Sequence, residues 1–274
     1  MIPRRRIRLL FLLSGLAALL AALSALWGMV QPGFYHMVPE QLRPGAYSQD
    51  TVTLAAAVGI ALSIRAIRNG LEIAWTVWAG LVGYLVYAYA LYSFDRVVTP
   101  AFPLYLAVLG LSVFAAALFL RHVDVQALVV REGRAPPRRG VALLLGVLVV
   151  LFAGLWAGML APAIMAGEAL DGMTIFVLDL AFALPLTALA AILAWRGSPA
   201  GDLLAIVMLM KVGTLGVSVF LGTAYAPLFF GAAASLSELA LYGLMGFGPL
   251  VLLWPYLRAL TVQQPPMPEA ARGG

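Results

Sequence analysis

Eight stretches of this sequence are long and apolar enough to cross a lipid bilayer, and they restrict the possible folds more than any other feature. A bilayer core of about 30 Å needs roughly 20 apolar residues in a helix. The stretches are rich in Leu and Ala and do not alternate with polar residues, which favours helices over a β-barrel. The sequence predicts an all-α, polytopic transmembrane bundle with spans near residues 7–29, 51–67, 73–94, 101–120, 141–164, 173–195, 203–223 and 236–257.

Composition agrees with a membrane protein and excludes several classes of site. The chain of 274 residues is 63% hydrophobic and only 11% charged, whereas soluble chains average about 25% charged. It has no cysteine and two histidines, which excludes disulfides and thiolate centres and leaves too few ligands for a metal site. Phosphate-binding and dinucleotide-binding fingerprints are missing from the sequence as well. We therefore expect no metal, no cofactor and no nucleic acid partner.

Arginine predicts the orientation of the chain. Sixteen of the seventeen basic residues are Arg, and fourteen of these fall on one set of connections and termini against two on the other. Cytoplasmic segments carry such an excess of basic residues. Both termini are therefore predicted to be cytoplasmic. A basic loop over residues 122–140 would meet anionic lipid headgroups on that side.

Similar landmarks recur in the two halves of the chain, which predicts an internal repeat. A Trp, a Pro, an Asp and an Arg recur at offsets of 129, 130, 129 and 128 residues. These pairs are Trp27 and Trp156, Pro32 and Pro162, Asp50 and Asp179, and Arg68 and Arg196. Four spans per half would make the repeat parallel. We expect a first half over 1–121, the loop 122–140, a second half over 141–262 and a disordered cytoplasmic tail over 263–274. Such a duplication fits a transporter with its site between the halves, or four-helix units duplicated for packing alone.

Lys211 is the only lysine and the one basic residue that the topology does not explain. It follows Asp202 by nine residues, which places it roughly 13–14 Å deep in its span. Ionisable groups at such depth are costly and usually face a bundle interior or a cavity. Thr214 and Ser218 share its helical face. Lys211 is therefore a candidate for proton or anion binding, or a lysine bonded for structural reasons.

Asp179 is the nearest candidate partner of Lys211. It precedes Arg196 by 17 residues, or about 25 Å, so a direct pair must bridge about 11 Å of depth. The reach of lysine and a kink at Pro185 could close that gap, and a water-filled vestibule between the two groups is the alternative. Asp179 could also simply stabilise a helix start. Asp50 is a further candidate for a substrate or proton site, with the same helix-start role as its alternative.

Three further residues are weaker candidates. Tyr84 and Tyr87 lie deep in the third span, and their hydroxyls need hydrogen-bond partners, for which Lys211 or Asp179 would serve. Glu238 lies near the outer boundary of the eighth span, as a third acid of the same site or a solvated helix-start residue.

Two regions carry a resemblance. Ser48-Gln49-Asp50 up to Pro103-Leu104-Tyr105, and Asp179 with Lys211-Val212-Gly213, resemble a group of uncharacterised bacterial eight-span membrane proteins. The resemblance would cover most of the chain and implies a bacterial inner membrane. That group has no established activity, so the resemblance assigns no functional residue. A late-helix lysine also resembles microbial rhodopsins, but the eight spans and the third span without an acid argue against that fold.

Three functions follow from these observations. The first is a small secondary transporter or channel-like protein for a small anionic or protonatable solute, with Lys211 as the central cation and Asp179 as its partner. The second is a membrane-embedded sensor or assembly subunit whose charges hold helices together. The third, an intramembrane enzyme on a lipid-like substrate, lacks any recognisable catalytic constellation.

Overall fold

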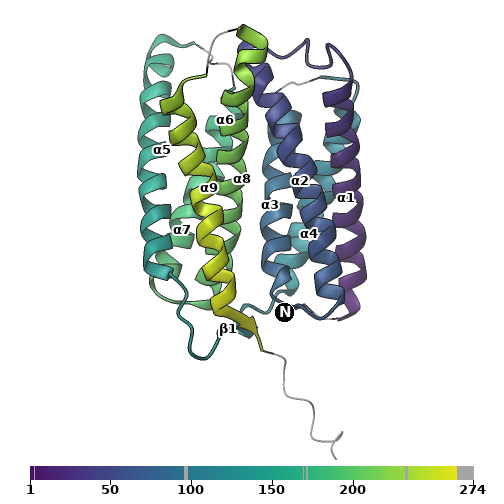
Figure 1. Ribbon diagram of the computed structural model, residues 1–274, viewed down its shortest axis with the longest axis vertical. Helices are drawn as coiled ribbons and strands as arrows, with labels where there is room; N and C mark the ends of the chain where they lie inside the picture. The colour runs from purple at the N-terminus through teal and green to yellow at the C-terminus, as the bar shows by residue number, and fades with distance from the viewer. Residues whose placement is uncertain (3, 96–97, 169, 171, 232–233, 264–274) are drawn as a thin grey trace, which may run out of the picture.

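The computed structural model describes residues 1–2, 4–95, 98–168, 170, 172–231 and 234–263. Eight helical segments in that part of the chain are long and apolar enough to cross a membrane, which confirms the predicted multi-pass helical fold. Figure 1 shows them as one bundle of roughly parallel rods. The long helices are α1 (Arg4–Val30), α2 (Arg43–Arg68), α3 (Ala74–Phe94), α4 (Phe102–His122), α5 (Arg138–Ala166), α8 (Pro199–Phe230) and α9 (Leu236–Ala259). The sixth span, Met173–Trp195, consists of α6 (Met173–Leu178), a π-helical turn (Asp179–Ala183) and α7 (Leu184–Trp195).

Two helices begin well before the predicted spans, and in α8 a capping residue marks the new start. A short 3₁₀ turn, Glu40–Leu42, leads into α2, which starts at Arg43 rather than near 51 and has Pro44 in its first turn. The Ser198 hydroxyl accepts a hydrogen bond from the Gly201 amide, and this cap starts α8 at Pro199 rather than near 203. The far end of α8 is reached only at Gly231, whose φ of 66° is readily adopted by glycine. The polar residues Ser48, Gln49 and Asp202 therefore lie within α2 and α8 and not in the connections.

The widened turn in the sixth span has a local cause. Pro185 lacks an amide hydrogen, and its ring would clash with the carbonyl one turn earlier in a regular α-helix. The π-helical turn Asp179–Ala183 ends two residues before this proline and widens the helix where the clash would occur. Asp179 is the first residue of that turn and lies inside the span. It is therefore not a helix-start residue.

The first four and the last four spans pack differently. Helix α1 packs against α2 and α4, and α3 packs against α2 and α4, so these four helices form a closed ring. In the described residues the last four spans form a row instead, in which α5 packs on α7, α7 on α8, and α8 on α9. Helix α8 also packs against α2 and α3, so it joins the row to the ring (Figure 1).

Close approach of the backbones holds α9 on α8. A Cβ atom added at Gly246 would lie 2.5 Å from the amide nitrogen of Val217, and one at Gly216 would lie 2.6 Å from Gly246 Cα. Small residues allow membrane helices to approach in this way and to gain van der Waals contact. Hence only glycine fits at this crossing.

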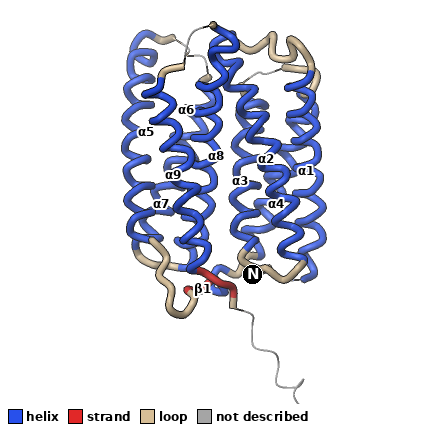
Figure 2. The backbone as a smooth tube through the Cα atoms, in the orientation of Figure 1, coloured by secondary structure: helices blue, strands red, loops and turns tan. Residues whose placement is uncertain are grey.

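The connection predicted as a basic loop contains regular structure. Residues 122–140 include a 3₁₀ turn (Val125–Ala127), the strand β1 (Leu128–Val130) and the first turn of α5, which starts at Arg138. Strand β1 pairs antiparallel with β2 (Leu260–Val262), so segments 130 residues apart meet at one end of the bundle. Figure 2 shows this two-stranded sheet at the end that also holds the N-terminus, called the sheet end below. The predicted disordered tail, apart from residue 263, lies outside the described residues.

Candidate functional site

Lys211 of α8 and Asp179 of the sixth span form an ion pair inside the bundle. The Lys211 Nζ lies 3.3 Å from Asp179 Oδ1 and donates a hydrogen bond to it. Both side chains are enclosed, with exposed fractions of 12% for the lysine and 6% for the aspartate. The pair therefore lies away from the solvent that weakens surface ion pairs.

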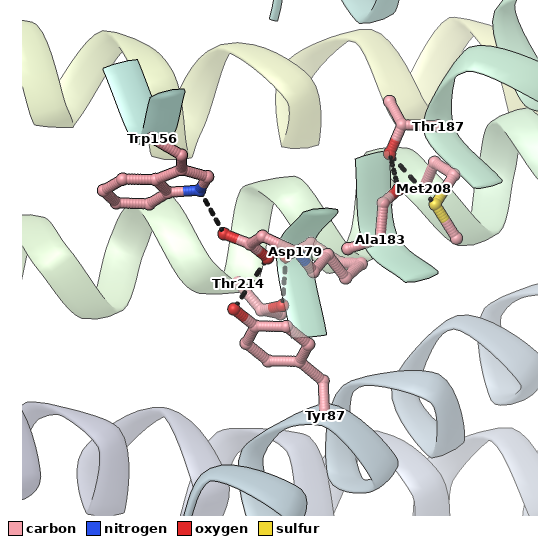
Figure 3. Close-up of polar contacts among 8 residues, drawn as sticks. Tyr87, Trp156, Asp179, Ala183, Thr187, Met208 and Thr214 are labelled. Carbon is pink, nitrogen blue, oxygen red and sulfur yellow. Dashed lines mark hydrogen bonds and ion pairs between the residues drawn. The ribbon is translucent and has the colours of Figure 1, made fainter. Parts of the chain in front are cut away.

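Two aromatic side chains complete the coordination of Asp179. The Tyr87 hydroxyl donates to Asp179 Oδ1 at 2.8 Å, and Trp156 Nε1 donates to Oδ2 at 3.0 Å. Figure 3 shows these two side chains reaching Asp179 from different helices, α3 and α5. Lys211 Nζ also lies 4.1 Å from the centre of the Tyr87 ring, within range of a cation–π interaction. The site, called the Asp179 cluster below, combines α3, α5, the sixth span and α8.

Helix boundaries explain how the two charges meet despite the depth difference estimated from sequence. Helix α8 starts at Pro199, so Lys211 lies 12 residues, or about 18 Å, along it. Asp179 lies 16 residues, or about 24 Å, before Trp195 at the end of α7. The remaining offset of about 6 Å is within the length of a lysine side chain. The lysine side chain alone can therefore span the difference in depth, without a kink at Pro185 that displaces the helix.

The two charges of the Asp179 cluster depend on each other. As a carboxylate, Asp179 accepts three hydrogen bonds and neutralises Lys211, so neither charge is left uncompensated. A proton on Asp179 would remove that compensation and leave the ammonium group in need of another anion. The arrangement can therefore link binding of a proton to binding of an anion.

A second polar network lies between the same two groups of helices. The Ser218 hydroxyl on α8 donates to Gln49 Oε1 at 3.0 Å, and it lies 3.2 Å from the Ser48 hydroxyl on α2. Gln49 Nε2 in turn donates to the Tyr84 hydroxyl on α3 at 2.8 Å. These contacts join α8 to α2 and α3, seven residues along α8 from Lys211. We call this line of contacts the polar seam.

The candidates predicted from sequence fall in several places. Tyr84 bonds Gln49 and the Thr53 hydroxyl and does not touch the ion pair, whereas Tyr87 does. The Thr214 hydroxyl donates to the carbonyls of Met210 and Lys211 within its own helix. Ser218 belongs to the polar seam, two turns from Lys211.

Two acids predicted as candidates lie outside the Asp179 cluster. Glu238 is exposed in the first turn of α9, where its amide donates to the Ser235 hydroxyl, so it is a solvated helix-start residue. Asp50 is buried in α2 among tyrosines, and its carboxyl group accepts a hydrogen bond from the Tyr35 hydroxyl. The structure therefore separates Asp50 and Glu238 from Lys211.

Sequence reasoning missed two members of these networks. Trp156 is a landmark of the predicted repeat and not a predicted site residue, yet its indole N–H donates a hydrogen bond to Asp179. Gln49 is an amide in an apolar span and joins α2 to α8. A polar or indole group inside a span needs a hydrogen-bond partner, and this requirement was the available signal.

The Lys211 and Asp179 side chains are nearly enclosed in this structure. A surface pocket lies at the sheet end, between the start of α5 and the end of α7, and Arg138, Arg139 and Trp195 contribute to its walls. None of its lining residues belongs to the Asp179 cluster. In the described residues, no group of three His, Cys, Asp or Glu side chains lies close enough to hold a metal ion.

Comparison of the chain with protein-family models, with curated proteins and with solved structures finds no match. The resemblance to bacterial eight-span proteins therefore rests on the sequence motifs alone. The eight apolar helices establish an integral membrane protein in a lipid bilayer.

Proposed function

We propose that this integral membrane protein is a small secondary transporter in which the Lys211–Asp179 pair couples a proton to a small anionic solute. The observation that carries the proposal is the pair itself, 3.3 Å apart and enclosed inside a membrane bundle. Ionisable residues in such positions are expensive and mark substrate or proton pathways. The same pair would be a costly means of packing helices alone.

The proposed coupling follows from charge balance. When Asp179 is ionised, Lys211 has its counter-ion and gains little from a second anion. When Asp179 takes a proton, Lys211 stays charged in a low-dielectric surrounding and attracts an anion from solution. One proton and one anion would then bind together, and both would leave together when Asp179 ionises again.

The position of the pair supports this role. Tyr87 belongs to the first four spans, whereas Asp179, Trp156 and Lys211 belong to the last four. A relative movement of the two groups would change the hydrogen bonds of Asp179 directly. The polar seam along α8 supplies further polar groups beside this boundary. In the parallel four-plus-four repeat that we propose, the site would lie between the two halves.

The proposal includes the setting of the protein. We infer a bacterial inner membrane from the resemblance, and cytoplasmic termini from the arginine excess near the termini and at the sheet end. Under that orientation Asp179 lies nearer the external face and Lys211 nearer the middle of the membrane.

A second candidate function has one observation in its favour. The two charged side chains are nearly enclosed, and every charge in the cluster is already compensated. This is the expected state of a sensor or assembly subunit in which the pair only locks helices together. Such a protein would bind no solute at Lys211.

Proton flux in reconstituted vesicles separates the two candidates. The purified chain is placed in liposomes that contain a pH-sensitive dye, and a panel of small carboxylates or inorganic phosphate is added outside. We expect proton entry that depends on one of these anions with the wild type and is abolished in Lys211→Met. In Tyr87→Phe, which loses a donor to the carboxylate, the flux should reach half its maximum at a lower anion concentration, because the less stabilised Asp179 carboxylate competes less well with the solute for Lys211.

The control is Glu238→Gln, which neutralises an exposed acid and should leave the flux unchanged. If Lys211→Met fails to fold, the change in the half-maximal anion concentration in Tyr87→Phe decides the test. Wild-type vesicles no more permeable than protein-free vesicles would reject transport and favour the sensor or assembly subunit.

A further inference from the structure

Asp50 is an enclosed carboxyl group that the proposed function does not use. It lies on α2 with 3% of its surface exposed. In the described part of the chain it forms no ion pair, in contrast to Asp179 and Asp202, the other two enclosed aspartates. Its polar contacts come from two tyrosines instead. Enclosure of an ionised carboxylate without a cation is very unfavourable, and such groups take up a proton.

The hydrogen bonds around Asp50 fit a neutral carboxylic acid. The Tyr35 hydroxyl donates to Asp50 Oδ2 at 2.7 Å. The Tyr92 hydroxyl lies 3.2 Å from the Ala46 carbonyl and 3.5 Å from Asp50 Oδ1, so the carbonyl is its better acceptor. A proton on Oδ1 could then be donated to the Tyr92 oxygen, while Tyr92 donates to Ala46. Every polar hydrogen in this chain of contacts would have an acceptor.

The backbone of α1 closes the site on another side. A Cβ atom added at Gly28 would lie 2.5 Å from Asp50 Oδ2 and 2.6 Å from the Tyr35 hydroxyl oxygen. There is thus no space for a water molecule between α1 and the carboxyl group. Burial, with the nearby acid as the second cause, raises the pKa of Tyr35 far above its usual range, so Tyr35 remains a hydrogen-bond donor.

The titratable groups around Asp50 on the packed elements are phenols. Tyr35 stands in the connection between α1 and α2, and its ring packs against Tyr47 and Tyr92. Helix α3 supplies Tyr89 and Tyr92, and α4 supplies Tyr105, which stacks on Tyr92. Helix α8 contributes Tyr225, which reaches the neighbouring Thr51. Near neutral pH these phenols carry no charge that could stabilise or repel a carboxylate.

We propose that Asp50 is a second proton-binding site of this protein, a carboxyl group that holds its proton at neutral pH within the Tyr35–Tyr92 cluster. The proposal does not rest on transport at Lys211. Proton binding forms one O–H bond at Asp50 Oδ1 and requires no other reactant. Two acids that correspond in the sequence repeat would thus have opposite states, Asp179 ionised beside Lys211 and Asp50 neutral.

Infrared spectroscopy tests this directly, because the C=O stretch of a protonated carboxyl group is separate from that of a carboxylate. The full chain in lipid at neutral pH should show a protonated band that is lost in Asp50→Asn. Asparagine has the same shape as the neutral acid and can make the same contacts, so this variant should fold. In Tyr35→Phe the band should move to higher frequency, because the carbonyl oxygen loses its donor.

Two controls make the assignment specific. Tyr89→Phe removes a hydroxyl that bonds Ser24 and the Ala21 carbonyl rather than Asp50, and should leave the band unchanged. Asp179→Asn should also leave it unchanged. A wild-type spectrum without the band, or a band that survives Asp50→Asn, would overturn the proposal. If Asp50→Asn does not fold, a band that keeps its frequency in Tyr35→Phe would also overturn the proposal.

Discussion

Neutralising either member of the Lys211–Asp179 pair should destabilise the protein, and the two losses should differ. Removing one partner of a buried pair costs about 3–5 kcal/mol of unfolding free energy, because the other charge stays enclosed. Both side chains are nearly buried, at 12% and 6% exposed, so solvent screening offsets little of this loss. We expect a loss of this size for Lys211→Met, in which Asp179 keeps the Tyr87 and Trp156 donors.

Asp179→Asn should cost more than Lys211→Met. Three donors approach the two oxygens of Asp179, from Lys211, Tyr87 and Trp156. An amide has one oxygen, so at least one of these donors would face an N–H group. An unsatisfied buried donor costs about 1–3 kcal/mol in addition. The double variant should be less destabilised than the sum of the single variants, because neither charge is then stranded.

Equilibrium unfolding in mixed detergent micelles, followed by tryptophan fluorescence, measures these differences. Glu238→Gln is the matched control, because it removes an exposed acid and should change stability by less than about 0.5 kcal/mol. Strict additivity of the two single variants, or an Asp179→Asn variant more stable than Lys211→Met, would refute the reasoning.

Three further predictions concern packing and hydrogen bonds elsewhere. Gly246→Ala should be about 1–3 kcal/mol less stable than Gly248→Ala, because only the first adds a methyl group against the backbone of α8, at 2.5 Å rather than 3.9 Å from its nearest neighbour. Comparing the two by thermal unfolding cancels the helix preference of alanine. Asp202→Ala removes the acceptor of two side chains, an arginine and a tyrosine, and should lose at least about 1.5–3 kcal/mol in the same assay. Gln49→Ala should lose about 1–3 kcal/mol and speed hydrogen exchange in α2 and α8, whereas unchanged exchange would contradict its role in the polar seam.

Span number could be read from the sequence, whereas span ends could not. A membrane helix must be apolar over roughly 20 residues whatever surrounds it, so composition alone marks each one. The ends depend on capping and on neighbouring helices. Ser198 and Pro199 start α8 before its apolar run, and α2 includes Ser48 and Gln49 because their side chains meet Ser218 on α8.

Lys211 and Asp179 could be singled out because a charge in an apolar run is costly wherever the helix lies. Whether the two side chains meet depends on where their helices start and end. The boundaries expected from sequence left Lys211 and Asp179 too far apart in depth for a direct contact. The sequence also does not single out Trp156 and Tyr87 as the partners of Asp179. The sequence contains several tryptophans and tyrosines in spans, and only the packing of α3 and α5 against the sixth span selects these two as donors to Asp179.

Asp50 and Asp179 illustrate the division most clearly. Sequence by itself determined a chain of eight helices with few, costly internal charges, and these two acids are among them. Tertiary structure decided that Asp179 meets Lys211 and Asp50 meets Tyr35 and Tyr92. The reason is that the cost of burying a charged side chain can be inferred from the apolar residues beside it in the sequence. The partner that offsets this cost comes from another helix, which only packing places beside it.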